Sequence, residues 1–252
     1  MKNTDNKNCA LILGATSDIG REIAEELSSK NFDLILTGQN KDLLSQIHSD
    51  LLRTTKQDIK IQTHLLDITE TDGLTSFVLS LDPLPNIVFC CIGYYKDQKI
   101  ARVKPEEFTK TIQINFTGIA TFLNLLTIRM EEIRSGKIVV ISSVAGVRGR
   151  QLNYIYGSAK AGLTTYLSGL RNLLHKKNIR ITTVLLGPVF TKMSAGHNLM
   201  PWITLQPKVA AKKIVQAGLK GKDEVYIHWI WQFIMAAIRM IPEGIFKRLP
   251  PF

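Results

Sequence analysis

Short apolar runs alternate along the chain with longer segments in which apolar residues recur every three or four positions. The short runs have the length of buried strands, and the longer segments have the period of amphipathic helices. We expect strands at Cys9–Leu13, Leu34–Thr37, Lys60–Leu65, Ile87–Ile92, Lys137–Ser142, Arg180–Leu186 and Glu224–Ile227. We expect helices at Ile19–Lys30, Lys41–Thr54, Thr71–Leu81, Pro105–Glu131, Ile155–His175 and Pro207–Leu219.

This alternation predicts an α/β fold, a doubly wound parallel sheet of the Rossmann type with helices on both faces in three layers. Such sheets bind ligands beyond the carboxyl ends of their strands. Gly14, Gly93, Ser143 and Gly187 each follow a predicted strand, so we expect all four at that edge. No linker divides the chain. We therefore take residues 1–252 as one domain that ends in an apolar, basic-flanked tail, residues 225–252.

A chain of 252 residues can bury a full core as one domain. Its three cysteines are too few for a disulfide framework, and we expect reduced core thiols. The polar start lacks the apolar core of a signal peptide, which favours a cytoplasmic protein. The net charge of +11 suits anionic partners, but we find no nucleic-acid-binding signature and assign no metal site.

Residues 14–20, Gly-Ala-Thr-Ser-Asp-Ile-Gly, connect the first predicted strand to the first predicted helix. Gly14 and Gly20 let the backbone approach a pyrophosphate, and the free N–H groups of a helix N-terminus favour an anion. Strand, glycine turn and helix in this order predict a dinucleotide site. An ordinary strand–helix turn is the alternative for the glycines taken alone.

Tyr156 and Lys160 lie four residues apart, so on a helix they share one face. A free phenol has a pKa of about 10, and a neighbouring ammonium lowers it toward the range useful for acid–base catalysis. Ser143 lies upstream and adds a hydroxyl, while Asn115 adds an amide further back. Taken singly, each residue has an ordinary structural explanation. Together they predict a catalytic group.

Together these residues resemble the short-chain dehydrogenase/reductase family over nearly the whole chain. The matching motifs follow the family's order: the glycine turn, Asp67-Ile68, Asn115–Gly118, Ser143 within Ile141–Gly146, Tyr156 with Lys160, and Gly187–Thr191. The resemblance implies an NAD(P)-dependent oxidoreductase in which Tyr156 exchanges a proton with the reacting oxygen. It implies that Lys160 also binds the nicotinamide ribose, Ser143 holds the carbonyl oxygen, and Asn115 anchors a water linked to Lys160.

The resemblance also implies the cofactor contacts. They fall on Gly14, Thr16, Ser17, Asp18, Ile19, Gly20, Gln39, Asp67, Ile68, Gly93, Tyr156, Lys160, Pro188, Val189 and Thr191. Asp18 replaces a usual glycine, and we expect it to cap the following helix while Arg21 offsets its charge. Cys90-Cys91-Ile92-Gly93 replaces the usual Asn-Asn-Ala-Gly, where Gly93 suffices for backbone contact. Gln39 is neither acidic nor basic, so the choice between NAD and NADP stays open.

The C-terminal tail is rich in tryptophan, phenylalanine and isoleucine but is interrupted by His228, Gln232 and Arg239. Its apolar part is shorter than the roughly 20 residues that a membrane-spanning helix needs. An aromatic helix with basic flanks fits one that lies in a membrane interface. Packing against the core or a second subunit is an equal alternative.

The tail and the loop 146–156 also resemble the reductase component of decaprenylphosphoryl-ribose 2′-epimerases, best at 220–222, 239–242 and 245–250. That resemblance implies reduction of a keto-sugar on a polyprenyl phosphate, for cell-wall biogenesis, after a partner flavoprotein oxidises the hydroxyl. Arg148 and Arg150 are then candidates to bind the phosphate, with solvated loop charges as the alternative. A soluble carbonyl reductase for acyl, steroid-like or other small ketones and a catalytically idle nucleotide-binding scaffold also remain open. We expect a homodimer or tetramer, possible contact with the inner face of the membrane, and no nucleic-acid partner.

Overall fold

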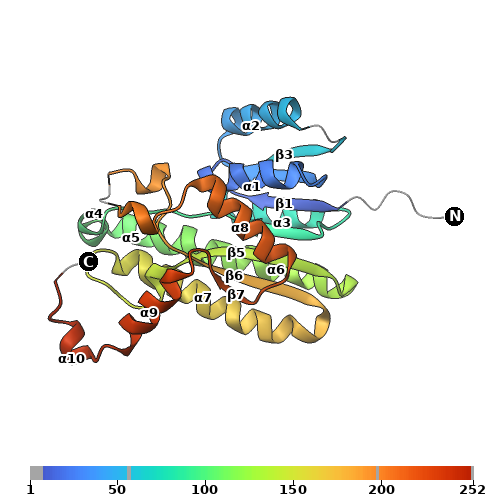
Figure 1. Cartoon of the computed structure of the whole chain (residues 1–252). Coiled ribbons are helices and arrows are strands. Elements are labelled where there is room, and N and C mark those ends of the chain that lie inside the picture. The colour runs from blue at the N-terminus through green and yellow to red at the C-terminus, as the bar shows by residue number, and fades with distance from the viewer. Residues whose placement is uncertain (1–7, 56–57, 197–198, 251–252) are drawn as a thin grey trace.

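In the computed structural model, which describes residues 8–55, 58–196 and 199–250, a parallel sheet forms the centre of the molecule (Figure 1). Its seven strands lie in the order β3-β2-β1-β4-β5-β6-β7. They are β1 Cys9–Leu13, β2 Asp33–Gly38, β3 Ile61–Leu65, β4 Ile87–Cys90, β5 Gly136–Ser143, β6 Ile179–Leu186 and β7 Glu224–Tyr226. Every predicted strand is present, and the doubly wound α/β fold is confirmed.

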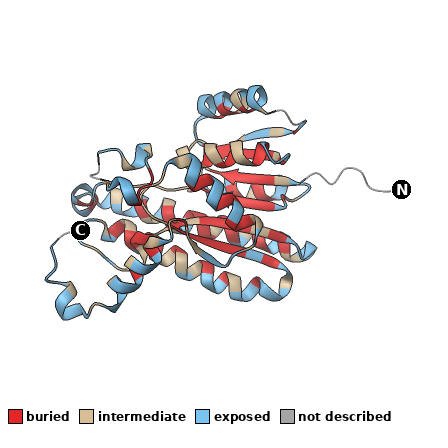
Figure 2. Ribbon diagram, viewed as in Figure 1, coloured by how far each residue is buried: buried red, intermediate tan, exposed pale blue. Residues whose placement is uncertain are grey.

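Helices cover both faces of the sheet. They are α1 Asp18–Ser28, α2 Lys41–Thr54, α3 Thr71–Ser80, α4 Gln98–Val103, α5 Pro105–Ile112, α6 Gly118–Ile133, α7 Tyr154–Leu174, α8 Pro207–Leu219, α9 Ile230–Met240 and α10 Glu243–Phe246. Helices α1, α2 and α8 pack on one face, and α3, α6 and α7 pack on the other. Their inner sides are buried and their outer sides are exposed (Figure 2).

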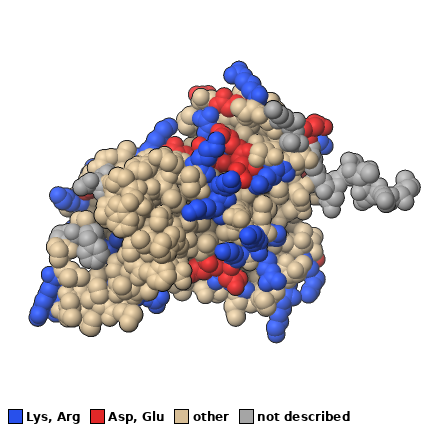
Figure 3. Space-filling model, viewed as in Figure 1, with Lys and Arg blue, Asp and Glu red and all other residues tan. Residues whose placement is uncertain are grey.

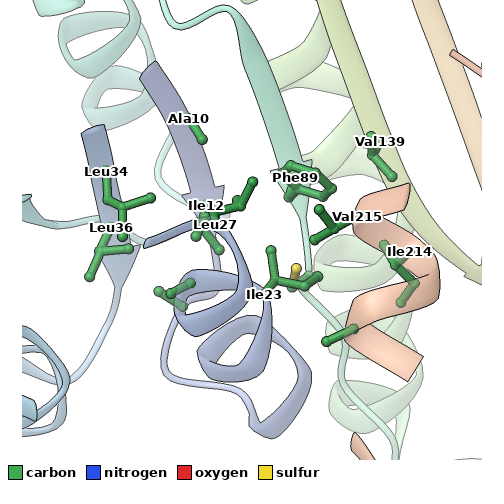
Figure 4. Close-up of a cluster of buried hydrophobic side chains, with 14 of the residues drawn as sticks. Ala10, Ile12, Ile23, Leu27, Leu34, Leu36, Phe89, Val139, Ile214 and Val215 are labelled. Atoms are coloured by element: carbon green, nitrogen blue, oxygen red, sulfur yellow. The ribbon is translucent and has the colours of Figure 1, made fainter. Parts of the chain in front are cut away.

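Alternate residues of each strand enter opposite cores, because side chains point to opposite faces along a strand. Ala10 and Ile12 of β1 pack with Ile23 and Leu27 of α1, beside α8 (Figure 4). Leu11 of β1 faces the other core, with α6 and α7. Both faces of the sheet are therefore buried under helices, which explains why the sequences of the central strands are continuously apolar.

The predicted helix Pro105–Glu131 is divided by a π-helical turn, Gln113–Thr117, which joins α5 to α6. By length and composition alone the stretch Pro105–Ile133 could cross a membrane, but a core helix passes the same test. Eight residues of α6 are buried, and most of them pack in the second core. We interpret this segment as a helix of the hydrophobic core. A π-turn inside a helix often marks a functional site.

The C-terminal segment has two different sides. Its strand β7 pairs with β6, and Trp231 and Met235 of α9 are buried against Val144, Leu185 and Ile203. Its other side exposes large apolar side chains: Trp229, Phe233, Met240 and Ile245. Of the alternatives left open for the tail, packing against the core therefore holds for β7, which was predicted as a strand, and for the inner side of α9.

Candidate active site

The glycine turn leaves an open cradle at the N-terminus of α1. Gly14 adopts a φ of +75°, which favours glycine, and a Cβ there would lie 3.2 Å from the carbonyl carbon of Cys91. A Cβ on Gly20 would lie 2.3 Å from the carbonyl oxygen of Gly14, so α1 packs directly on the turn. Side chains at either position would displace the backbone of the turn. The cradle fits a pyrophosphate.

Ser17, and not Asp18, caps α1. The Ser17 hydroxyl accepts a hydrogen bond from the N–H of Gly20 at 3.1 Å, so the expected Asp18 cap is wrong. The Asp18 carboxylate instead accepts a hydrogen bond at 2.7 Å from the N–H of Lys192, in the loop after β6. Arg21 is paired with Asp50 at 2.8 Å and with Glu25. Asp18 thus ties the two loops that border the cleft.

Ser143, Tyr156 and Lys160 meet at the carboxyl end of β5. The buried Lys160 donates a hydrogen bond from Nζ to the carbonyl of Ile141 at 3.0 Å. The hydroxyls of Tyr156 and Ser143 are hydrogen-bonded to each other. Tyr95 covers the Tyr156 ring edge-on, with 5.5 Å between the ring centroids. The structure therefore brings together three residues that lie on two different elements.

Burial decides the protonation of this group. It raises the pKa of Tyr156 to about 12, although the hydrogen bond from Ser143 opposes the shift. It lowers the pKa of Lys160 to about 8. The expectation that Lys160 lowers the pKa of the phenol is not met in this structure, where the ammonium lies 5.9 Å from the centre of the Tyr156 ring. A phenol that keeps its proton at neutral pH is suited to donate it.

Asn115 lies in the π-turn, fully buried and outside the cleft. Its side-chain nitrogen donates to the carbonyls of Tyr94 at 2.7 Å and Thr111 at 2.9 Å, and its oxygen accepts from the N–H of Tyr94. These bonds fix the turn after β4, which includes Gly93. The water-anchoring role that the resemblance implies stays a prediction.

A cleft of about 670 Å³ runs along the carboxyl edge of the sheet. The predicted residues that line it are Gly14, Thr16, Ser17, Asp18, Ile19, Gln39, Ile68, Gly93, Ser143, Tyr156, Lys160, Pro188, Val189 and Thr191. Gly20 and Asp67 do not line it. Gly20 packs behind Gly14, and hydrogen bonds from Thr69 and Gln39 outweigh burial and lower the pKa of Asp67.

Lys110, Tyr94, Lys192 and Met193 also line the cleft, and the sequence analysis did not single them out. Lys110 lies over the ring of Tyr94 at 4.7 Å, and the Tyr94 hydroxyl donates to Glu107. The local sequence carries no signal for these contacts, because α5 meets the turn after β4 only in the folded chain. Lys110 and Lys192 add positive charge to a site suited to an anion.

The two arginines proposed for a substrate phosphate do not line the cleft. Arg148 donates to the carbonyls of Ile238 and Ile241 and forms an ion pair with Glu243 at 2.9 Å. Its guanidinium is therefore occupied by the C-terminal segment. Burial lowers the pKa of Arg150, and its Nε has no hydrogen-bond partner among the described residues. The phosphate-binding role expected of Arg150 stays a prediction.

The family model for short chain dehydrogenase matches residues 8–201, from β1 through the cleft-lining loop after β6. The chain belongs to the short-chain dehydrogenase family. An uncharacterised oxidoreductase of Mycobacterium tuberculosis is 30% identical over 244 residues, covering 95% of this chain and 96% of the relative. One from Streptomyces coelicolor is 28% identical over 245 residues, covering 95% of this chain and 94% of that protein.

Solved structures of similar fold extend the comparison. A short-chain dehydrogenase from Burkholderia cenocepacia in complex with NADP covers 97% of this chain and 98% of its own, with a TM-score of 0.83 and 19% identity. One from Sphingobium yanoikuyae in complex with NADPH covers 96% of each chain, with a TM-score of 0.79 and 19% identity. This short-chain dehydrogenase is an NAD(P)-dependent oxidoreductase, and its cradle and cleft fit that cofactor.

Proposed function

We propose that this short-chain dehydrogenase reduces a keto group on a sugar carried by a polyprenyl phosphate, with NADH or NADPH as the hydride donor. The observation that carries this proposal is the exposed aromatic side of the C-terminal segment, which lies beside a polar reduction site. Trp229 and Phe233 are 65% and 64% exposed. Large apolar surfaces left open to solvent usually mark a binding site.

The cofactor supplies the hydride, and the chain supplies the proton and the charge stabilisation. Tyr156 donates its proton to the reacting oxygen, a role that its raised pKa favours. Ser143 hydrogen-bonds the same oxygen and stabilises negative charge that develops there. Lys160, charged at neutral pH with a pKa of about 8, keeps positive charge close to Tyr156. The intact group argues against a catalytically idle scaffold.

The charge around the tail supports an anionic lipid partner. The lower left of the molecule, where Figure 1 places α9 and α10, is largely free of charged side chains, with Lys and Arg at its rim (Figure 3). Arg239, Lys247 and Arg248 belong to this segment. Apolar contact and attraction to anionic headgroups together bind peripheral proteins. We propose a cytoplasmic enzyme that touches the inner face of the membrane.

The proposed substrate also implies partner proteins. A keto-sugar on a lipid carrier must be produced by oxidation of the corresponding hydroxyl, and we propose a flavoprotein oxidase for that step. A role in cell-wall precursor biogenesis would follow. Ile128, Ile133 and Leu173 on α6 and α7 are exposed apolar residues suited to contact between subunits. We therefore also propose a homodimer or tetramer.

A soluble carbonyl reductase is the second candidate, and the inner side of α9 favours it. Trp231 and Met235 show that part of the tail is core, as in a tail that serves only for packing. The two candidates differ in what the outer side of the tail contacts. A soluble enzyme needs no lipid there, whereas a lipid-linked substrate does.

A substrate panel tests the proposal. Purified protein with NADPH is given keto-sugar polyprenyl phosphates and, separately, soluble acyl, steroid and small ketones. We expect turnover of the lipid-linked compounds to exceed that of every soluble ketone. The double variant Trp229→Ser/Phe233→Ser should lose activity on the lipid-linked substrate but keep NADPH affinity. Preference for a soluble ketone, with no effect of the double variant, would favour the second candidate.

A further inference from the structure

Arg148 connects the loop after the catalytic strand β5 to the end of helix α9. It follows Ser143 by five residues and precedes Tyr156 by eight. Its side chain donates to the carbonyls of Ile238 and, at 2.6 Å, Ile241. The last carbonyls of a helix lack partners within the helix, and a cation there also meets the negative end of the helix dipole. Arg148 therefore caps α9 from another part of the chain.

The same side chain holds α10. Its guanidinium forms an ion pair with Glu243 and lies 3.7 Å from the centre of the Phe246 ring. Arg148 is mostly buried, with 16% of its side chain exposed, whereas Glu243 is 76% exposed. A planar guanidinium can bond in two directions and stack at once, which a lysine ammonium cannot do. One residue thus fixes the last turn of α9 and the helix that follows.

The other end of α9 touches the opposite wall of the cleft. A Cβ on Gly187 would lie 2.2 Å from Nε1 of Trp231, so the indole occupies the space beside this cleft-lining glycine. Trp231 also packs with Val144, next to Ser143. The Nε1 of Trp231 is buried without a hydrogen-bond partner among the described residues. Helix α9 therefore spans the loops after β5 and β6, both of which border the reacting centre.

We propose that Arg148 is a positioning residue that holds residues 228–249 against these two loops, so that the C-terminal segment supports the loops that border the active site. The proposal holds whichever ketone the enzyme reduces. It replaces a phosphate-binding role for Arg148 with a mechanical one. Trp231 contacts both loops, so release of Arg148 should loosen this packing and leave the pyrophosphate cradle at Gly14 and Gly20 unchanged.

A protein with one tryptophan provides the readout. The chain has three tryptophans, and Trp202 and Trp229 are exposed, so Trp202→Phe/Trp229→Phe leaves Trp231 alone. Energy transfer from Trp231 to bound NADPH then reports how close α9 lies to the cleft. In this background we expect Arg148→Ala to reduce energy transfer at saturating NADPH by about half or more, because the freed segment samples open states. Affinity for NADPH should stay within about threefold.

Limited digestion with trypsin gives a second measure in the same proteins. Cleavage after Arg239, Lys247 and Arg248 should accelerate by about tenfold or more in Arg148→Ala, because cleavage follows local opening. Glu243→Gln removes only the ion pair and should have a smaller effect. Arg148→Lys keeps the charge but loses the planar guanidinium with its paired N–H donors, so its cleavage rate should lie between those of the wild type and Arg148→Ala. Arg134→Gln is the matched control, since Arg134 also donates to a backbone carbonyl, that of Lys176, but at the other end of β5.

Two results would overturn the proposal. One is wild-type energy transfer in Arg148→Ala, with or without faster trypsin cleavage, because α9 would then keep its position beside the cleft without Arg148. The other is an equal loss of energy transfer in Arg134→Gln. If Arg148→Ala fails to fold, Arg148→Lys and Glu243→Gln decide, and unchanged energy transfer and cleavage in both would also refute the proposal.

Discussion

Gly20→Ala should weaken both cofactor binding and folding, because the new Cβ would press on the turn that forms the cradle. The new Cβ would lie 2.3 Å from the carbonyl oxygen of Gly14, 2.9 Å from Oγ of Ser17 and 3.1 Å from Cα of Ala15. Ordinary carbon contacts are about 3.5–4.0 Å, so α1 must move away from the turn by about 1 Å. Two of the three obstacles are backbone atoms and cannot rotate away.

Two free energies follow from that movement. Overpacking of this kind costs about 1–3 kcal/mol of folding stability. The N–H groups at the start of α1 also move, and loss of one hydrogen bond to a charged phosphate costs about 1.5–3 kcal/mol of binding. At about 1.4 kcal/mol for each factor of ten, NADPH should bind about 10- to 100-fold more weakly.

Titration calorimetry with NADPH and thermal unfolding together measure both effects. Gly169→Ala is the matched control, because Gly169 lies on the exposed side of α7 and a Cβ there would meet nothing within 4 Å. Alanine in that helix should raise stability by about 0.5–1 kcal/mol and leave NADPH binding unchanged. An NADPH affinity for Gly20→Ala within a factor of about two of the wild type would refute the assigned role of the turn.

Three further outcomes are expected. Tyr156→Phe should lower turnover by about 100-fold or more while NADPH binding survives, and near-normal turnover in a steady-state assay would remove Tyr156 from its role. Burial lowers the pKa of Lys160 from 10.5 to about 8, so between these values the unfolded chain binds more protons than the folded one. The contribution of Lys160 to the free energy of unfolding should therefore rise with pH across that window, so the difference in that free energy between the wild type and Lys160→Met should shift in favour of the wild type as the pH rises in denaturant titrations. Trp231→Ala should cost about 3–5 kcal/mol in the same titrations, against about 0.5 kcal/mol or less for the exposed Trp229→Ala, and equal losses would contradict the two-sided tail.

Much of the fold could be predicted from local pattern. The strand β1 has the predicted bounds, Cys9–Leu13, and α2 has the predicted bounds Lys41–Thr54. Such elements are long or fully apolar, so their period or burial is plain in the sequence. The short helix α4, Gln98–Val103, was not predicted, because six residues with no clear period carry little signal.

The catalytic residues were also predictable, because their spacing is local. Four residues on a helix place Tyr156 and Lys160 on one face in any fold that keeps the helix. Their pKa values were not predictable. The expected lowering of the Tyr156 pKa is not met, because the burial of the phenol, which no spacing reveals, raises the pKa more than the hydrogen bond from Ser143 lowers it.

The sequence by itself determined the alternation of strands and helices, the glycine turn before α1, the residues of the reaction centre and, through their order, the family. Each of these depends on neighbours within a few positions along the chain. Only the tertiary structure decided that Asp18 meets Lys192, that Arg148 meets Ile241, and that Trp231 fills the space beside Gly187. These pairs lie far apart in the sequence, and packing alone brings them together. The function of the tail therefore depends on which of its sides the sheet has buried.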